Sequence, residues 1–333
     1  MKGAQKMLPS VLQPNETDHV PVLAEEVREL LAIEPGQTVV DATFGAGGHA
    51  SVLAADLKGD GRFIAIDRDP TVRPYFEGFK RHAGVQSRFL RGEASVVLDQ
   101  LAENGVHADA ILLDLGVSSM QIDRPERGFS YAVDAPLDMR MDPTADLSAA
   151  DLVNESPERE LVTIFRQYGE ERYAKQIARA IGRRRRKEPI ERTGELVEII
   201  RAAIPAPARF GEGHPAKRVF QALRIAVNDE LGELEEALPA AFEMLRPGGR
   251  LAVIAFHSLE DRIVKRFFAD ERRGCVCPPE VPVCVCGKNP RLRLVTRPSL
   301  TPSAAEIAAN PRARSAKLRA GERTAAPAWR LAA

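Results

Sequence analysis

A glycine-rich segment is the first feature of the sequence that indicates a binding site. Gly45-Ala-Gly-Gly-His-Ala50 follows an apolar run, and its glycines and last alanine fit the G-x-G-x-x-A spacing of dinucleotide-binding turns. Asp67 ends the next apolar run, 22 residues after Gly45. A carboxylate placed there can accept hydrogen bonds from two ribose hydroxyls. The spacing predicts an adenosine-type ligand, and it fits NAD and S-adenosylmethionine equally well.

A further acid ends a fully apolar run later in the chain. Asp114 stands in Leu113-Asp-Leu-Gly-Val-Ser-Ser119, so two hydroxyls follow it closely. Ligands of open α/β sheets bind at the carboxyl ends of strands, where such residues lie. Ser118 and Ser119 could accept a proton from an amino group that acts as a nucleophile, and Asp138 is a second-choice acceptor. For this segment alone, an ordinary strand-end turn is an equally good interpretation.

All four cysteines of the chain lie within one short segment, as Cys275-x-Cys277 and Cys284-x-Cys286. Four thiolates this close together could bind zinc tetrahedrally. Reduced surface thiols explain the pattern equally well. A secreted disulfide scaffold would spread its cysteines along the chain, so disulfides are the least favoured reading and a reducing cytoplasm is favoured. The sequence leaves the metal question open.

Predicted strands and helices alternate in the first third of the chain and would hold these residues in place. Apolar runs predict strands at 38–44, 62–67, 87–90, 110–115, 250–256 and 291–296. Helical patterns occupy 50–57, 71–82 and 93–104, and Ser258-Leu-Glu-Asp261 fits a capping box with Ser258 as the cap. This alternation implies a mostly parallel sheet with right-handed crossovers.

The expected fold is therefore α/β: a Rossmann-like, mostly parallel sheet with an inserted all-helical domain. Between 124 and 230 the sequence shows helices and loops but no good strand. The expected parts are a flexible tail at 1–18, a discontinuous sheet domain at 19–123 and 231–300, a helical insertion at 124–230 that recognises the substrate, and a basic, poorly packed tail at 301–333.

Charge is distributed unevenly along the chain, although 47 Lys and Arg balance 47 Asp and Glu. Residues 166–224 hold fifteen Lys and Arg against seven acids, and residues 291–330 hold nine against two. Arg172, Lys175, Arg179 and Arg183 recur on one helix face, and Arg183–Lys187 is a run of five cations. Two such segments favour a nucleic-acid partner, whereas solubility explains either one alone about equally well. No long uncharged stretch or signal peptide is found, so no membrane association is expected.

Taken together, these segments resemble the RsmH (MraW) family of bacterial rRNA methyltransferases. The similarity extends from about residue 19 to 315 and includes Asp41–His49, Ala65–Pro70, Leu112–Ser119, Pro136–Asp142, Phe256–Arg262 and Asn310–Ser315. The resemblance implies a class I methyltransferase fold. It also implies S-adenosylmethionine-dependent N4-methylation of one cytidine in the decoding centre of 16S rRNA, in the small ribosomal subunit.

The resemblance also implies which residues contact S-adenosylmethionine. They are Gly47, Gly48, His49, Asp67, Asp114 and Gln121, with a further contact near Ala94, where relatives often carry an aromatic residue. It does not settle the role of the cysteines.

Two other functions stay in view at this point. A nicotinamide-dependent dehydrogenase fits the glycine spacing. However, the sequence shows no evident set of catalytic residues for hydride transfer, and this function leaves the basic segments unexplained. An RNA-binding assembly factor without catalysis would keep the basic face only.

A cytosine C5-methyltransferase would need a cysteine to attack the ring, and none lies near the predicted strand ends. The sequence leaves open whether naked rRNA or an assembled subunit is the substrate, and whether the chain is a homodimer.

Overall fold

The computed structural model describes residues 21–209, 214–278, 280 and 282–328, so the predicted tail at 1–18 lies outside the described residues. One seven-stranded sheet has the order β3-β2-β1-β4-β5-β7-β6. The neighbouring pairs among β1 to β5 are parallel, and β7 is antiparallel to both β5 and β6. The strands are β1 (Thr38–Asp41), β2 (Arg62–Asp67), β3 (Gln86–Arg91), β4 (Ala108–Asp114), β5 (Leu245–Ala255), β6 (Leu292–Leu294) and β7 (Lys317–Arg323).

Helices cover both faces of this sheet. They are α1 (Ala24–Leu31), α2 (Gly48–Asp56), α3 (Arg73–His82), α4 (Ala94–Glu103), α12 (Glu230–Met244) and α13 (Ser258–Arg272). Successive residues of β1, Val39 and Val40, are both fully buried but belong to two different hydrophobic clusters. A strand with both faces buried is apolar throughout, which explains the continuous apolar runs in the sequence.

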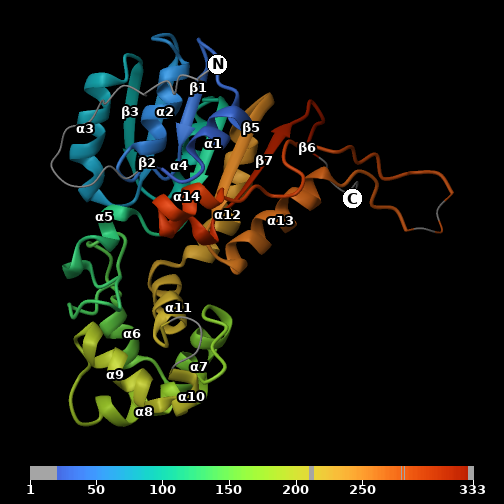
Figure 1. Cartoon of the computed structure of the whole chain (residues 1–333). Coiled ribbons are helices and arrows are strands. Elements are labelled where there is room, and N and C mark those ends of the chain that lie inside the picture. The colour runs from blue at the N-terminus through green and yellow to red at the C-terminus, as the bar shows by residue number, and fades with distance from the viewer. Residues whose placement is uncertain (1–20, 210–213, 279, 281, 329–333) are drawn as a thin grey trace.

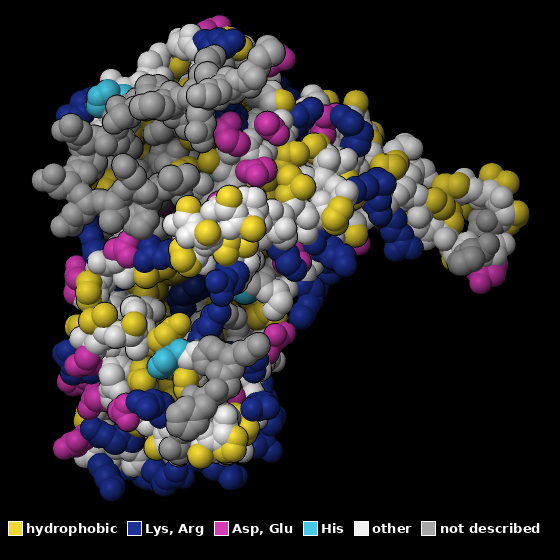
Figure 2. Space-filling model, viewed as in Figure 1, with side chains coloured by type: hydrophobic (Ala, Val, Ile, Leu, Met, Phe, Trp, Pro, Cys, Tyr) yellow, Lys and Arg dark blue, Asp and Glu magenta, His cyan; other side chains and the backbone are white. Residues whose placement is uncertain are grey.

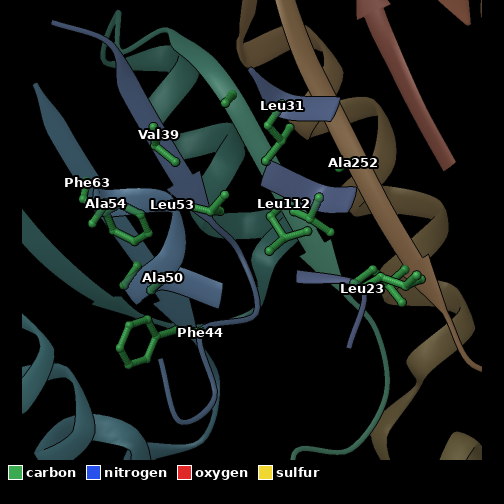
Figure 3. Close-up of a cluster of buried hydrophobic side chains, with 14 of the residues drawn as sticks. Leu23, Leu31, Val39, Phe44, Ala50, Leu53, Ala54, Phe63, Leu112 and Ala252 are labelled. Carbon is green, nitrogen blue, oxygen red and sulfur yellow. The ribbon is translucent and has the colours of Figure 1, made fainter. Parts of the chain in front are cut away.

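The first cluster packs α1, α2 and α3 against the sheet. Figure 3 shows Phe44, Leu53, Phe63 and Leu112 converging there, with small alanines between the larger side chains. The Phe44 ring meets the rings of Phe76 and Phe79 edge-on, at centroid distances of 5.7 and 5.6 Å. This packing fixes the chain just before the glycine-rich turn, because Phe44 directly precedes Gly45.

The chain between β4 and α12 forms the helical insertion, which lies below the sheet domain in Figure 1. Its helices are α5 (Ser119–Ile122), α6 (Ala149–Glu155), α7 (Glu158–Gln167), α8 (Ala174–Arg185), α9 (Thr193–Ala203), α10 (Ala206–Arg209) and α11 (Lys217–Asn228). A third hydrophobic cluster runs from Leu137 to Leu223 and includes no residue of the sheet. The predicted α/β fold, with a mostly parallel sheet and an inserted helical domain, is confirmed.

Two helix starts differ from expectation. The basic helix begins at Ala174, so Arg172 lies outside it and packs over the Tyr173 ring, 4.6 Å from the centroid. The cap of α13 is His257, one residue before Ser258, and Glu260 accepts a hydrogen bond from the His257 backbone N–H at 3.1 Å. A histidine ring can accept the capping hydrogen bond as a hydroxyl does, and this shifts the box by one residue.

The prediction of a poorly packed tail at 301–333 is wrong. This segment contains α14 (Ala304–Ala309) and strand β7, which lies between β5 and β6 with Leu318 and Ala320 fully buried. The alternation that makes β7 a strand is short and interrupted by charges, so the composition concealed it. The sheet domain therefore extends to Arg323.

Cations of this C-terminal segment are largely paired within the protein. Arg319 and Lys317 bind Asp261, at 2.8 and 3.2 Å. Arg312 binds Asp123, which directly follows Ile122, at 2.6 Å. The excess of positive charge at 291–330 is therefore used in part to hold the sheet domain together, and it is weaker support for a nucleic-acid partner than the count suggested.

No helix among the described residues is long and apolar enough to cross a membrane.

Candidate cofactor and substrate site

The glycine-rich turn joins β1 to α2 and is tightly constrained. Gly45 and Gly47 have φ values of +54° and +79°, which residues with a side chain rarely adopt. A Cβ on Gly47 would lie 2.8 Å from Cζ of Phe44, which is held in the core. The turn thus needs glycine both for its backbone angles and for its close contact with Phe44.

Asp67 lies at the end of β2 and reaches this turn. Its Oδ2 accepts a hydrogen bond from the Gly45 N–H at 2.8 Å, and its Oδ1 accepts one from the Asp69 N–H at 2.9 Å. Burial raises the pKa of Asp67 to about 6, although these two hydrogen bonds oppose the rise. The group is thus mostly ionised at neutral pH, and each oxygen keeps a lone pair for a ligand hydroxyl.

His49 and Asp114 form the least satisfied part of the site. His49 Nε2 lies 3.6 Å from Asp114 Oδ2, beyond hydrogen-bond distance. Among the described residues, neither ring nitrogen of His49 nor Asp114 Oδ1 has a hydrogen-bond partner, although all three atoms are buried. Buried polar atoms without partners are rare and costly. Since 29% of the Asp114 side chain is exposed, a ligand can reach this carboxyl group.

Burial also controls protonation here. It lowers the pKa of His49 to about 4, so the ring is neutral at physiological pH. It raises the pKa of Asp114 to about 8, with further contributions from the charges of Asp41 and Glu260. At neutral pH the Asp114 carboxyl group is therefore mostly protonated unless a positively charged group binds beside it.

Gln121 belongs to a network just beyond the strand ends. Its Oε1 accepts a hydrogen bond from the Ser118 N–H, and its Nε2 donates to Asp69 Oδ2, both at 3.0 Å. Asp69 is fully buried and also accepts a hydrogen bond from Arg127 at 2.9 Å. Burial raises the pKa of Asp69, but hydrogen bonds from Gln121 and Thr71 outweigh it and hold the pKa below its usual value. Sequence reasoning missed Asp69, whose only signal was its place two residues after Asp67.

The candidate proton acceptors differ in the hydrogen bonds and ion pairs that they already make. Ser118 caps α5, and its Oγ accepts from the Gln121 N–H at 3.4 Å. The described contacts include no hydrogen bond from the Ser119 hydroxyl. Asp138 is held by Arg140, whose Nη2 lies 2.6 Å from Asp138 Oδ2, and no described contact joins Asp138 to the strand ends. Ala94 begins α4 and, like Leu90, packs against the second cluster.

The structure therefore brings most of the predicted site residues to one edge of the sheet. Hydrogen bonds link the glycine turn to Asp67, and the Asp114 N–H donates to the Thr43 hydroxyl at 2.6 Å. Gln121 and Ser118 join this edge through Asp69. The cysteines lie elsewhere, in the loop between α13 and β6 that projects from the domain in Figure 1.

A comparison with protein families decides the identity. The model of the MraW methylase family matches residues 16–324. This chain belongs to the MraW methylase family. It is 55% identical over 307 residues to ribosomal RNA small subunit methyltransferase H of Heliobacterium modesticaldum, covering 92% of this chain and 98% of that protein. The protein of the same name from Symbiobacterium thermophilum is 54% identical over 303 residues, 91% of this chain and 95% of that protein.

A solved structure, a putative rRNA methylase from Clostridium thermocellum, aligns with a TM-score of 0.41 and 13% identity, over 91% of this chain and 97% of that chain. As a member of the MraW methylase family with a Rossmann-like sheet, the chain is a class I methyltransferase, and its methyl donor is S-adenosylmethionine. The residues fit this donor, because the edge offers ionised Asp67 for hydroxyl groups and the carboxyl group of Asp114, whose side chain is 29% exposed, for a cationic group. The dehydrogenase interpretation is thereby set aside.

Proposed function

We propose that this MraW-family methyltransferase transfers the methyl group of S-adenosylmethionine to N4 of one cytidine in the decoding centre of 16S rRNA. The observation that carries the proposal is the sheet edge, where the turn, Asp67 and Asp114 leave acceptor positions open. Relatives with 49–55% identity over nearly their whole length are named ribosomal RNA small subunit methyltransferase H, which supports small-subunit rRNA as the substrate.

The residues of the edge would divide the binding of the methyl donor among them. Asp67 would accept the ribose hydroxyls through the lone pairs that its backbone partners leave unused. Gly47 and Gly48 would let the backbone approach the ligand closely. Asp114 and His49 would contact the polar end of S-adenosylmethionine. Ala94 would contact the adenine with a smaller apolar surface than an aromatic residue offers. Gln121 would act mainly by holding this edge in place through Asp69.

The chemistry at the acceptor is mostly a matter of position. The lone pair of cytosine N4 is delocalised into the ring, so N4 is a weak nucleophile and must be aligned with the methyl carbon and sulfur. An acceptor for one N4 proton would localise that lone pair. Ser119 fits best because its hydroxyl has no described partner, whereas Ser118 caps a helix and Asp138 binds Arg140. Protonated Asp114 is a poor acceptor at neutral pH.

The insertion would hold the rRNA while the target base leaves its stack. Figure 2 shows Lys and Arg side chains gathered over the lower part of the molecule, which the insertion forms. Within the run of five cations, Arg183, Arg186 and Lys187 are exposed. Arg184 instead binds Glu195 at 3.1 Å, and Arg185 donates to the Val153 carbonyl oxygen at 2.8 Å. Only the exposed members of the run are therefore proposed to contact phosphates.

The proposed location is the cytoplasm, because the proposed substrate is rRNA.

The proposal is tested by transfer of a labelled methyl group. Small subunits, large subunits and naked 16S rRNA, all from cells that lack the endogenous enzyme, are each incubated with the protein and labelled S-adenosylmethionine. We expect label in small-subunit rRNA, mapped by nuclease fragments to the decoding centre, and much less label with the Asp67→Ala variant at the same low donor concentration. Label confined to large subunits, or to small-subunit sites outside the decoding centre, would contradict the proposal.

A further inference from the structure

The loop between α13 and β6, residues 273–291, has no apolar core among its described residues. None of its residues belongs to any of the three hydrophobic clusters. Two of its valines face solvent, since Val283 and Val285 are 71% and 80% exposed. The loop nevertheless extends well away from the sheet in Figure 1. A segment that buries so little apolar surface needs another means of holding its conformation.

The four cysteines converge inside this loop. Their sulfur atoms all lie within 4.8 Å of one another. The sulfur of Cys286 lies 3.6 Å from that of Cys284 and 3.8 Å from that of Cys275. A disulfide needs a separation of about 2.05 Å. Four sulfurs placed tetrahedrally about 2.3 Å from a zinc ion are about 3.8 Å apart, which matches both measured separations.

Backbone donors point at these sulfurs. The N–H groups of Val276, Cys277 and Val285 donate to the sulfurs of Cys286, Cys275 and Cys277, each at 3.4 Å. Gly287, with φ of +64°, turns the chain directly after Cys286. N–H groups directed at sulfur stabilise negative charge there, as thiolate ligands of a metal require.

Four neighbouring thiolates repel one another, and a divalent cation bound among them removes that conflict.

We propose that Cys275, Cys277, Cys284 and Cys286 bind one zinc ion that replaces an apolar core for this loop. Binding releases four thiol protons, and no oxidation occurs. Four protein ligands leave no open coordination position, which is typical of structural zinc sites and excludes a bound water as nucleophile. The site is independent of the methyl-transfer edge and stands whether or not the proposed rRNA specificity is correct.

The full-length protein is tested first. It is produced in zinc-supplemented medium and purified under reducing conditions without chelators, and its metals are measured by plasma mass spectrometry. We expect about one zinc per chain, released by a mercurial that titrates thiols. A zinc-free protein, or one that contains iron in place of zinc, would overturn the proposal.

Variants show whether the cysteines are the ligands. The Cys284→Ser/Cys286→Ser variant should lose zinc, whereas Val283→Ser in the same loop should retain it, because that side chain faces solvent. Zinc retained by the double variant would refute the assignment. The binding of S-adenosylmethionine to the double variant checks that the sheet domain remains folded.

Two measurements on the wild-type chain do not depend on a folded variant. Cobalt exchanged for zinc should give the intense visible bands of a tetrahedral tetrathiolate, and an octahedral spectrum would refute the site. After zinc removal and denaturation, all four thiols should react with a thiol reagent. A deficit of two or four would indicate disulfides and overturn the proposal. Chelation should also make the 273–291 loop more sensitive to protease.

Discussion

The edge of the sheet and the helical insertion use polar side chains in opposite ways. At the edge, ionisable groups are buried and partly unpaired, as the ring nitrogens of His49 and Oδ1 of Asp114 show. In the insertion, no described buried side-chain polar atom lacks a partner, and cations such as Arg183 and Lys187 face solvent. Unpaired buried groups suit a small ligand that completes their hydrogen bonds, whereas exposed cations suit a large polyanion.

This contrast separates two tasks within one chain. Binding of the methyl donor should depend on a few buried atoms, and each should have a large effect. Binding of rRNA should depend on many exposed charges, and each should have a small, salt-dependent effect. Variants in either region therefore test whether the two tasks are separate.

The largest effect is expected at Asp67. Replacement by alanine removes about two charge-assisted hydrogen bonds to the ribose, worth about 2–4 kcal/mol, so affinity for S-adenosylmethionine should fall at least tenfold in calorimetry. Asp99→Ala, which removes an exposed acid on α4, serves as the control and should bind normally. Equal affinity for the Asp67→Ala and wild-type proteins would show that this carboxylate does not hold the donor.

The exposed cations of the insertion come next. Replacing Arg183, Arg186 and Lys187 by glutamine should weaken rRNA binding and reduce the slope of log affinity against log salt by about 0.7–0.9 per lost phosphate contact. Lys80→Gln/Arg81→Gln, on the exposed face of α3, should leave that slope unchanged. Affinity for S-adenosylmethionine should be normal in both. If the insertion variant keeps the wild-type slope, this surface only confers solubility.

A smaller effect is expected at the two serines, and it should distinguish them. Ser119→Ala should lower turnover about threefold to tenfold with little change in donor affinity or stability, as for a hydrogen bond made in the transition state. Ser118→Ala should also destabilise the protein by about 1 kcal/mol, because it removes a helix cap. Normal turnover in Ser119→Ala would exclude this hydroxyl as the proton acceptor.

The last effect concerns stability and pH rather than binding or turnover. The pKa of Asp114 is about 8 in the folded protein and near 3.8 when unfolded, so the folded state binds more protons between these values. Stability without the methyl donor should therefore fall as pH rises from about 4 to 8. Asp114→Asn removes this contribution, and its melting temperature should match that of wild type near pH 4 and exceed it by several degrees at pH 8. A constant difference across this range would mean that Asp114 does not titrate with a raised pKa.

The sequence was a good guide wherever a buried strand ended in a chemically active residue. The strands ending at Asp67 and Asp114 were visible because both faces of each are apolar, and parallel topology then brought their ends together. The glycine turn was visible because its backbone angles need glycine. These features follow from local pattern and one topological rule.

Features that depend on distant partners were not predictable. Strand β7 became visible only through its pairing with β5, because charges interrupt its short apolar alternation. Arg184 and Arg185 look like their exposed neighbours in the sequence, and only the fold shows that they hold Glu195 and the Val153 carbonyl group. Likewise, the spacing of the cysteines could not show that their four sulfur atoms form one cluster.

The most direct test of the proposed reaction is the identity of the modified nucleoside. Small-subunit rRNA methylated with isotope-labelled S-adenosylmethionine is digested to nucleosides and compared with standards by chromatography and mass spectrometry. N4-methylcytidine carrying the label is the expected product, because the sheet edge offers oxygen acceptors for an amine and no cysteine for attack on the ring. Labelled 5-methylcytidine, or a methyl group on the ribose, would contradict the mechanism and leave only the binding of the methyl donor standing.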